Sequence, residues 1–126
     1  HRLMKVADIM HSGNELPLAL PDDQMSEIIL EMTAKCLGCV GVLDADGQLH
    51  GMITDGDLRR HMGDKLLTAQ AVEIMTPRVR TIGPDALVSE ALSIMNSHSI
   101  TNLFVVEQNG PIGIIHIHDC LRAGVA

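Results

Sequence analysis

The chain has 126 residues, 46% of them hydrophobic, so it has the length of one compact domain and enough apolar residues to bury a core without disulfides or metal ions. Sixteen acidic residues against nine basic ones give a formal net charge of -7, which argues against nucleic acid and anionic membranes as partners. No apolar run approaches the roughly 18 residues of a membrane span and no signal peptide opens the chain, which favours a cytoplasmic protein.

The first half of the chain predicts a helix followed by a β-hairpin. Apolar residues recur with helical spacing after Pro21, at Met25, Ile28, Ile29, Met32 and Cys36. Strands are expected at residues 40–43 and 49–54, joined by a turn at residues 44–47. A short extended stretch at residues 16–20 precedes the helix, and a second helix is expected at residues 55–62.

The second half repeats this order, with an extended stretch at residues 79–82, a helix after Pro84, strands at 103–106 and 112–115, and a helix from about 117 to 123. The matching positions are Ile9-Met10 with Ile74-Met75, Gly51 with Gly113, Asp57 with Asp119, and Arg60 with Arg122. This duplication predicts an α/β (α+β) fold of two β-α-β-β-α units, residues 1–64 and 65–126. We expect the units to share one core around a pseudo-twofold axis and to leave two related clefts.

The order of elements and one motif resemble the CBS domain pair, over essentially the whole chain. The motif is Gly-hydrophobic-hydrophobic-Thr-x-x-Asp at the end of the last strand. It reads Gly51-Met52-Ile53-Thr54-Asp55-Gly56-Asp57 in the first copy and Gly113-Ile114-Ile115-His116-Ile117-His118-Asp119 in the second.

The Thr54 to Asp57 element has two interpretations. As a capping box, Thr54 accepts from the start of the next helix while Asp57 reaches back to the Thr54 amide. The resemblance implies instead that the carboxylate accepts from ribose hydroxyls and that the Thr hydroxyl faces phosphate. Arg59, near the same helix start, adds positive charge. The resemblance also implies that each Asp faces the first strand of the other unit, which brings Thr81 near Asp57.

The second copy departs from the motif, because His116 replaces Thr54 and His118 replaces Gly56. Two histidines at this spacing can chelate a metal, but no further ligand is evident nearby, so we expect no metal site. They remain either polar residues at a helix start or a pair that donates to phosphate or carboxylate. In the second case, ligand affinity should rise as the pH falls through about 6.5.

Cys36 and Cys39 form a C-x-x-C pair, but the pair follows a helix and leads into a strand. A redox pair opens a helix, where the dipole lowers the pKa of the first thiol, so we expect these cysteines to be structural. A small redox or metal protein built on Cys36/Cys39 or His116/His118 is therefore the least favoured class of function.

A narrower resemblance is to the C-terminal CBS pair of bacterial arabinose 5-phosphate isomerases. It rests on Asp8-Ile9-Met10-His11-Ser12-Gly13-Asn14-Glu15-Leu16-Pro17, on residues 54–60 and on residues 116–125. The resemblance implies that the chain lacks the catalytic domain and is not an enzyme by itself, whereas its parent is a sugar-phosphate isomerase of lipopolysaccharide or capsule synthesis.

Two functions follow from these resemblances. The first is regulation by a nucleotide, with no cofactor required. We hypothesise CMP-Kdo, the product of the pathway, or another cytidine nucleotide, with AMP or ATP as the alternative, because Phe104 is the only aromatic residue available to stack on a purine. The second is a purely structural module that forms a homodimer through its CBS helices and thereby organises a tetrameric enzyme.

Overall fold

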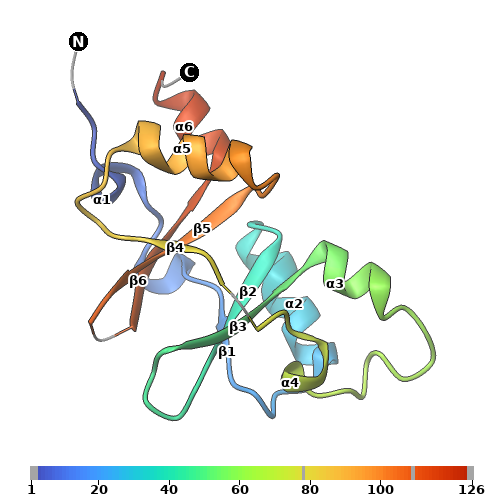
Figure 1. Ribbon diagram of the computed structural model, residues 1–126. Helices are drawn as coiled ribbons and strands as arrows, with labels where there is room; N and C mark the ends of the chain where they lie inside the picture. The colour runs from blue at the N-terminus through green and yellow to red at the C-terminus, as the bar shows by residue number, and fades with distance from the viewer. Residues whose placement is uncertain (1–2, 78, 109, 125–126) are drawn as a thin grey trace. The chain divides into compact units, whose positions relative to one another are not determined.

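The computed structural model describes residues 3–77, 79–108 and 110–124 of the chain. The chain divides into two compact units (Figure 1). The β1–β3 unit is Pro17–Val79, and the β4–β6 unit combines the residues up to Leu16 with those from Arg80 onward. These bounds differ from the predicted repeats at 1–64 and 65–126. The residues up to Leu16 belong to the β4–β6 unit, and residues 65–79 belong to the β1–β3 unit.

The β1–β3 unit contains a three-stranded sheet in the order β1-β2-β3. Its elements are β1 (Leu18–Ala19), α2 (Met25–Lys35), β2 (Cys39–Leu43), β3 (Leu49–Thr54), α3 (Asp55–Arg60) and α4 (Ala71–Ile74). Strand β1 pairs parallel with β2, and β2 pairs antiparallel with β3. Helix α2 is therefore the crossover between two parallel strands, which a two-residue turn cannot join.

The β4–β6 unit repeats this plan with the order β4-β5-β6. Its elements are α1 (Val6–Ile9), the 3-10 turn η1 (Gly13–Glu15), β4 (Thr81–Ile82), α5 (Val88–Ser97), β5 (Asn102–Glu107), β6 (Gly110–His116) and α6 (Ile117–Arg122). Strand β4 is parallel to β5, and β5 is antiparallel to β6. The predicted duplication of β-α-β-β-α is confirmed.

Each unit has its own hydrophobic core, whereas the sequence predicts one shared core. Helix α2 buries Met25, Ile28 and Met32 with Val40, Val42 and Ile53 of its sheet. Helix α5 buries Val88, Ala91, Leu92 and Met95 with Leu103, Val105 and Ile115. Buried positions three or four residues apart on each helix face the sheet, as the sequence spacing predicts. Both helices begin later than the Pro-Asp pairs suggest, at Met25 and at Val88. Before α2, Asp23 holds a turn by accepting from the Leu20 amide at 2.8 Å.

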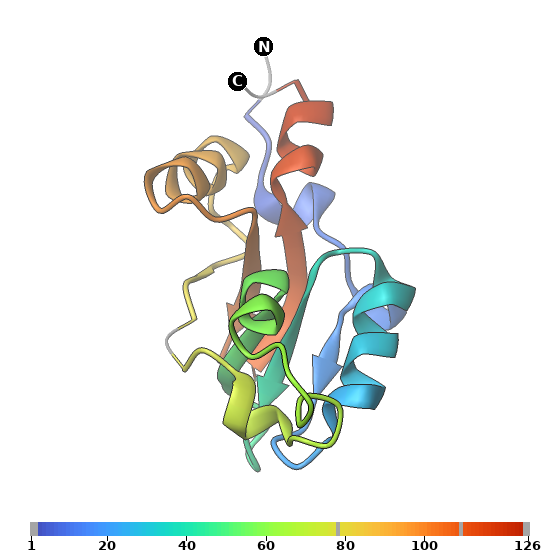
Figure 2. The same cartoon turned by 90° about the vertical axis from the view of Figure 1, so that its right-hand side faces the viewer.

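Each sheet has one short segment attached to its last strand. We call residues 5–16 the first lead-in and residues 70–77 the second. His11 and Ile114 exchange backbone hydrogen bonds of 2.8 and 2.9 Å, so the first lead-in extends the sheet edge at β6. Figure 2 shows this blue segment beside the red β6 and α6. Thr76 and Met52 make the same pair of bonds, at 2.8 and 2.9 Å, on β3. Each lead-in thus borders the carboxylate motif of the repeat that it does not precede in sequence.

Among the described residues, no helix is both long and apolar enough to cross a bilayer.

Candidate functional site

A buried carboxylate lies at the junction of β3 and α3. The Asp57 residue is 2% exposed. Its Oδ2 accepts from the Thr54 amide at 2.9 Å and from the Thr54 hydroxyl at 3.2 Å. Its Oδ1 accepts from the Thr76 hydroxyl at 2.8 Å and from the Arg60 guanidinium. We call these four residues the Asp57 cluster. All four acceptor positions of its carboxylate are occupied.

The surroundings of Asp57 keep its carboxyl ionised. Burial raises the pKa of the carboxyl, but the hydrogen bonds from Thr54, Thr76 and Arg60, together with the Arg60 charge, outweigh burial and lower the pKa below its usual range. Asp57 therefore carries a full negative charge at neutral pH. The Asp57 amide also donates to the Thr54 hydroxyl oxygen at 3.4 Å, which completes the capping box.

The equivalent carboxylate, Asp119, lies at the junction of β6 and α6 and is 6% exposed. Its Oδ2 accepts from the His116 amide at 2.8 Å, and its Oδ1 accepts from Arg122 at 2.6 Å. The Nε2 of His11 lies 3.0 Å from both oxygens. We call these four residues the Asp119 cluster. It has the plan of the Asp57 cluster, with imidazoles in place of both threonine hydroxyls.

His11 connects Asp119 to a second carboxylate. Its Nδ1 lies 2.6 Å from Oε1 of Glu15, four residues along the first lead-in. Burial lowers the pKa of the His11 ring, but hydrogen bonds to Glu15 and Asp119 outweigh burial and raise it. Burial likewise raises the pKa of Asp119, and the bonds from His116, His11 and Arg122 lower it below its usual range. Both shifts favour the charged forms, a cation on His11 and an anion on Asp119.

The two predicted histidines lie together at the start of α6. Their ring centroids are 4.6 Å apart, and the His116 Nδ1 accepts from the His118 amide at 3.0 Å. Burial and the charge of His118 lower the pKa of His116. Because Nδ1 is an acceptor, the Nε2 of neutral His116 carries the proton and can donate to a ligand. Among the described residues, no group of three or more His, Cys, Asp or Glu side chains is arranged to hold a metal.

The other predicted site residues lie apart from these hydrogen bonds. Arg59 is exposed on α3, and the arginine that bonds to Asp57 is its neighbour Arg60. Thr81 is exposed at the start of β4, in the unit that carries Asp119. Its predicted proximity to Asp57 stays a prediction.

Sequence reasoning missed three members of the clusters: Arg60, His11 and Thr76. The repeat contained the signal for all three. Arg60 matches Arg122, while His11 and Thr76 each follow an Ile-Met pair. The sequence did not indicate that each lead-in folds against the repeat that it does not precede in the chain.

The cysteines do not form a redox pair. Cys36 is exposed at the left-handed end of α2, with φ 60°. Burial raises the pKa of Cys39 to about 12, so its thiol is protonated at neutral pH. The sequence predicts buried small hydrophobic residues, which is confirmed for Cys39 and wrong for Cys36, because α2 ends at Lys35 before the apolar stripe reaches it.

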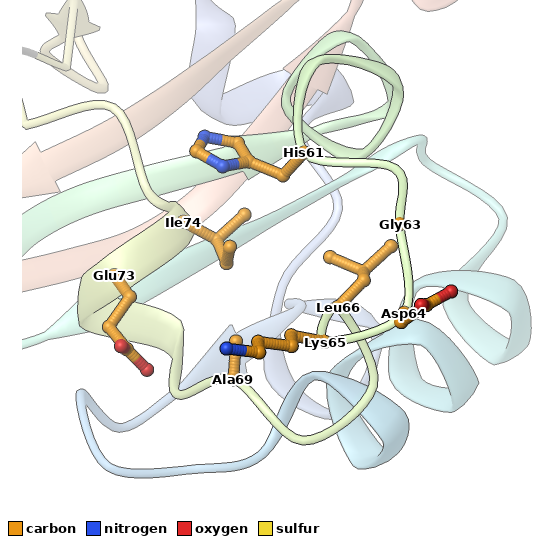
Figure 3. Close-up of a pocket in the computed structure, with 8 residues that line it drawn as sticks. All are labelled: His61, Gly63, Asp64, Lys65, Leu66, Ala69, Glu73 and Ile74. Carbon is orange, nitrogen blue, oxygen red and sulfur yellow. The ribbon is translucent and has the colours of Figure 1, made fainter.

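A hollow of about 370 Å³ lies in the β1–β3 unit, between the end of α3 and α4 (Figure 3). Its lining residues are His61, Gly63, Asp64, Lys65, Leu66, Ala69, Glu73 and Ile74. The lining contains one lysine, Lys65, and two carboxylates, Asp64 and Glu73, so its charge does not favour an anion. None of the predicted site residues lines it.

Comparison with known proteins identifies similar chains. The family model described as CBS domain matches residues 6–64 and 71–126. Arabinose 5-phosphate isomerase KdsD of Yersinia pestis is 40% identical over 125 residues, covering 98% of this chain and 38% of that protein. The KdsD protein of Escherichia coli strain K12 is 38% identical over the same shares. The uncharacterized protein RP505 of Rickettsia prowazekii is 44% identical over 124 residues, covering 98% of this chain and 39% of that protein. The chain thus spans less than two fifths of these relatives.

Solved structures share the fold. The CBS-domain containing protein ATU1752 from Agrobacterium tumefaciens superposes with a TM-score of 0.85 at 25% identity, covering 98% of this chain and 95% of that one. The CBS domain pair of protein MJ0100, in complex with 5-methylthioadenosine and S-adenosyl-L-methionine, gives 0.86 at 23% identity, with coverages of 98% and 97%. CBSX2 in complex with AMP gives 0.80 at 20% identity, with coverages of 96% for both chains.

Proposed function

Because the chain belongs to the CBS domain family and consists of a pair of such domains, we propose that it is the nucleotide-sensing regulatory region of a cytoplasmic arabinose 5-phosphate isomerase. The matched ranges account for nearly the whole chain, which contains no isomerase domain. Its effect on catalysis is therefore exerted on the rest of a longer protein. The observation that carries the proposal is the buried, ionised carboxylate at the end of the last strand of each unit.

The Asp57 cluster has donors that a ribose can replace. The Thr54 hydroxyl occupies Oδ2 and can rotate, and the Arg60 side chain on Oδ1 is 64% exposed and can turn into solvent. Their departure frees one acceptor position on each oxygen, which matches the two hydroxyls of a ribose. The Thr54 amide and the Thr76 hydroxyl continue to hold the carboxylate. The released Thr54 hydroxyl can then donate to phosphate.

For the ligand we propose CMP-Kdo or a related cytidine nucleotide, with AMP or ATP as the alternative. Phe104, the only Phe, Tyr or Trp residue of the chain, is fully buried, so a base has no exposed benzene or indole ring on which to stack. The acidic sugar of CMP-Kdo has potential donors in His116 and His118, beside Asp119. The adenosine compounds bound by the similar structures support the alternative.

Regulation requires that the ligand bind two states of the enzyme with different affinity. A feedback effector of the pathway would favour the less active state of the isomerase. The difference between the ligand's binding free energies in the two states then sets the size of the effect.

The second candidate function is a structural module that forms a homodimer and organises an isomerase tetramer. Apolar side chains exposed on helices favour it, in particular Leu30 on α2 at 71% and Leu121 on α6 at 53%. Such side chains are common at subunit interfaces. In this case, nucleotides would have no effect on the stability of the chain.

Thermal unfolding with a panel of ligands distinguishes the two functions. A ligand at 100 times its Kd stabilises the folded chain by about 2.7 kcal/mol. We expect CMP-Kdo or CMP to stabilise the parent and to stabilise Asp57→Asn less, because binding at the Asp57 cluster is removed. The matched control is Asp55→Asn, which removes an exposed carboxylate from the same helix. Stabilisation by AMP or ATP alone would identify an adenine nucleotide as the ligand in place of a cytidine nucleotide. The absence of any effect would favour the structural module.

A further inference from the structure

The two carboxylates differ in the donors that a ligand must displace. In the Asp57 cluster, a rotating hydroxyl and an exposed guanidinium leave one free position on each oxygen, as described above. In the Asp119 cluster, His116 stands where Thr54 supplies a hydroxyl, so Oδ2 has no such donor to release. Only Arg122, whose side chain is 71% exposed, can leave Asp119 at little cost.

The imidazole of His11 blocks the second position. Its Nε2 lies 3.0 Å from both oxygens of Asp119, and the His116 amide holds Oδ2 at 2.8 Å. When Arg122 leaves, Oδ1 gains one free position while Oδ2 gains none. A pair of ligand hydroxyls finds a free acceptor position on each of the two oxygens only if His11 also leaves.

The protonation state of His11 decides whether it stays. A neutral imidazole has one N–H, but both ring nitrogens of His11 face carboxylate oxygens, at 2.6 Å and 3.0 Å. Both contacts are hydrogen bonds only in the imidazolium form. Such charge-assisted bonds are about twice as strong as neutral ones, so a ligand hydroxyl competes poorly with them. The raised pKa of His11 agrees with this geometry.

The groups around the ring come from three elements and carry both signs of charge. They are Glu15 of η1, Asp119 and Arg122 of α6, and His116 of β6. Arg122 repels the imidazolium and two carboxylates attract it. Because His116 has a lowered pKa and stays neutral near neutral pH, it adds little repulsion there.

We propose that His11 closes the Asp119 cluster to ligand hydroxyls while its ring is doubly protonated, so that the chain binds one ribose at low pH and two at high pH. The Asp57 cluster is the site that stays open, since the neutral Thr76 occupies the equivalent position there. The inference rests on the proposed function, in which ribose hydroxyls bind these carboxylates. In this inference, the protonation of one side chain, that of His11, determines how many of the two sites are occupied.

The repeat supplies the matched substitution for the test. His11→Thr places the residue of position 76 at position 11, and an extended bridge residue accepts threonine well. NMR titration of the full chain first measures the His11 ring. We expect titration above the ordinary value of about 6.5, with both ring nitrogens protonated below it. Titration at or below that value would overturn the proposal.

Calorimetry with AMP and with CMP then counts sites at about pH 5.5 and about pH 9, on either side of the ordinary histidine pKa. For a nucleotide that binds, the parent should bind one at the lower pH and two at the higher. His11→Thr should bind two at both, because no imidazolium occupies Asp119. Two sites in the parent at the lower pH, or one site in His11→Thr at both, would overturn this inference and leave the proposed function standing. Absence of binding to both proteins at both pH values would overturn the proposed function and this inference with it.

Discussion

Thr76 and His11 occupy equivalent positions in the two units. Each follows an Ile-Met pair, makes a two-bond bridge to the last strand of a sheet, and donates from its side chain to a buried carboxylate. One is a neutral hydroxyl and the other an imidazole that can gain a proton and carry a positive charge. The duplicated fold therefore contains two clusters of the same plan with different donors and charges, which makes each copy a control for the other.

Thr76→Val should lower the free energy of unfolding by about 2 kcal/mol, the contribution of one hydrogen bond to a charged group. The substitution keeps the shape of the side chain and removes only the hydroxyl that donates to Asp57 at 2.8 Å. Urea unfolding followed by circular dichroism measures the change. Thr81→Val, at an exposed strand position, is the control and should stay within about 0.5 kcal/mol of the parent. Equal effects of the two substitutions would show that the Thr76 bond contributes nothing specific.

Gly51→Ala should destabilise the β1–β3 unit by about 2 kcal/mol, through overpacking. A Cβ at this position would lie 2.5 Å from the Met75 sulfur and 2.9 Å from the Thr76 carbonyl oxygen. Methionine can move, but the carbonyl belongs to the Met52–Thr76 bridge and cannot move without breaking it. The second lead-in would then separate from β3, and Thr76 from Asp57.

The control for Gly51→Ala is Gly63→Ala, where an added Cβ meets no atom within 4 Å. It should leave stability unchanged or raise it slightly, by reducing the freedom of the unfolded chain. Amide hydrogen exchange of residues near Thr76 distinguishes local separation from general loss of stability. Unchanged exchange there in Gly51→Ala would contradict the expected local separation.

Asp57→Asn should cost about 2 kcal/mol and remove nucleotide binding at its cluster. The capping role read from the sequence is worth about 1 kcal/mol, but the structure adds donors from Thr76 and Arg60 that the amide nitrogen of asparagine cannot accept. Urea unfolding and calorimetry with the same preparation separate the two effects. Asp55→Asn again serves as the exposed control. If Asp57→Asn binds nucleotide as well as the parent does, the carboxylate is a helix cap and nothing more.

The sequence predicts the fold well because its signals are local and occur twice. The apolar spacing of α2 and α5, the hairpins and the Thr54-to-Asp57 capping box all depend on residues close together in the chain. The partners His11 and Asp119 are 108 positions apart, and no local pattern connects them. Met62 shows a similar limit, because helical spacing continues past Arg60, whereas the helix ends there and leaves Met62 71% exposed. A contact such as that of His11 with Asp119 forms only because a lead-in pairs with the last strand of a sheet, and this pairing is not visible in the local sequence.

The stability contributions of His116 and His11 respond to acid in opposite directions. Burial and the neighbouring His118 lower the pKa of His116, so its neutral form is favoured in the folded chain. A histidine with a lowered pKa contributes stability that is fully present above about pH 6.5 and is lost as the pH falls through its folded pKa. His11, whose pKa is raised, contributes stability that is fully present below about pH 6.5 and is lost as the pH rises through its folded pKa.

His116→Thr, which restores the residue of the first repeat, should therefore lose less stability than the parent on acidification below about pH 6.5. Any gain in affinity from an anion that meets His116 should also begin below that pH, lower than the sequence alone suggests. Urea unfolding at a series of pH values measures the first effect, and calorimetry with CMP over the same series measures the second. His50→Thr, at an exposed position of β3, controls for the removal of a histidine. If His116→Thr and the parent lose stability in parallel as the pH falls, His116 is not held in its neutral form and the anion should strengthen its binding at the ordinary histidine pKa.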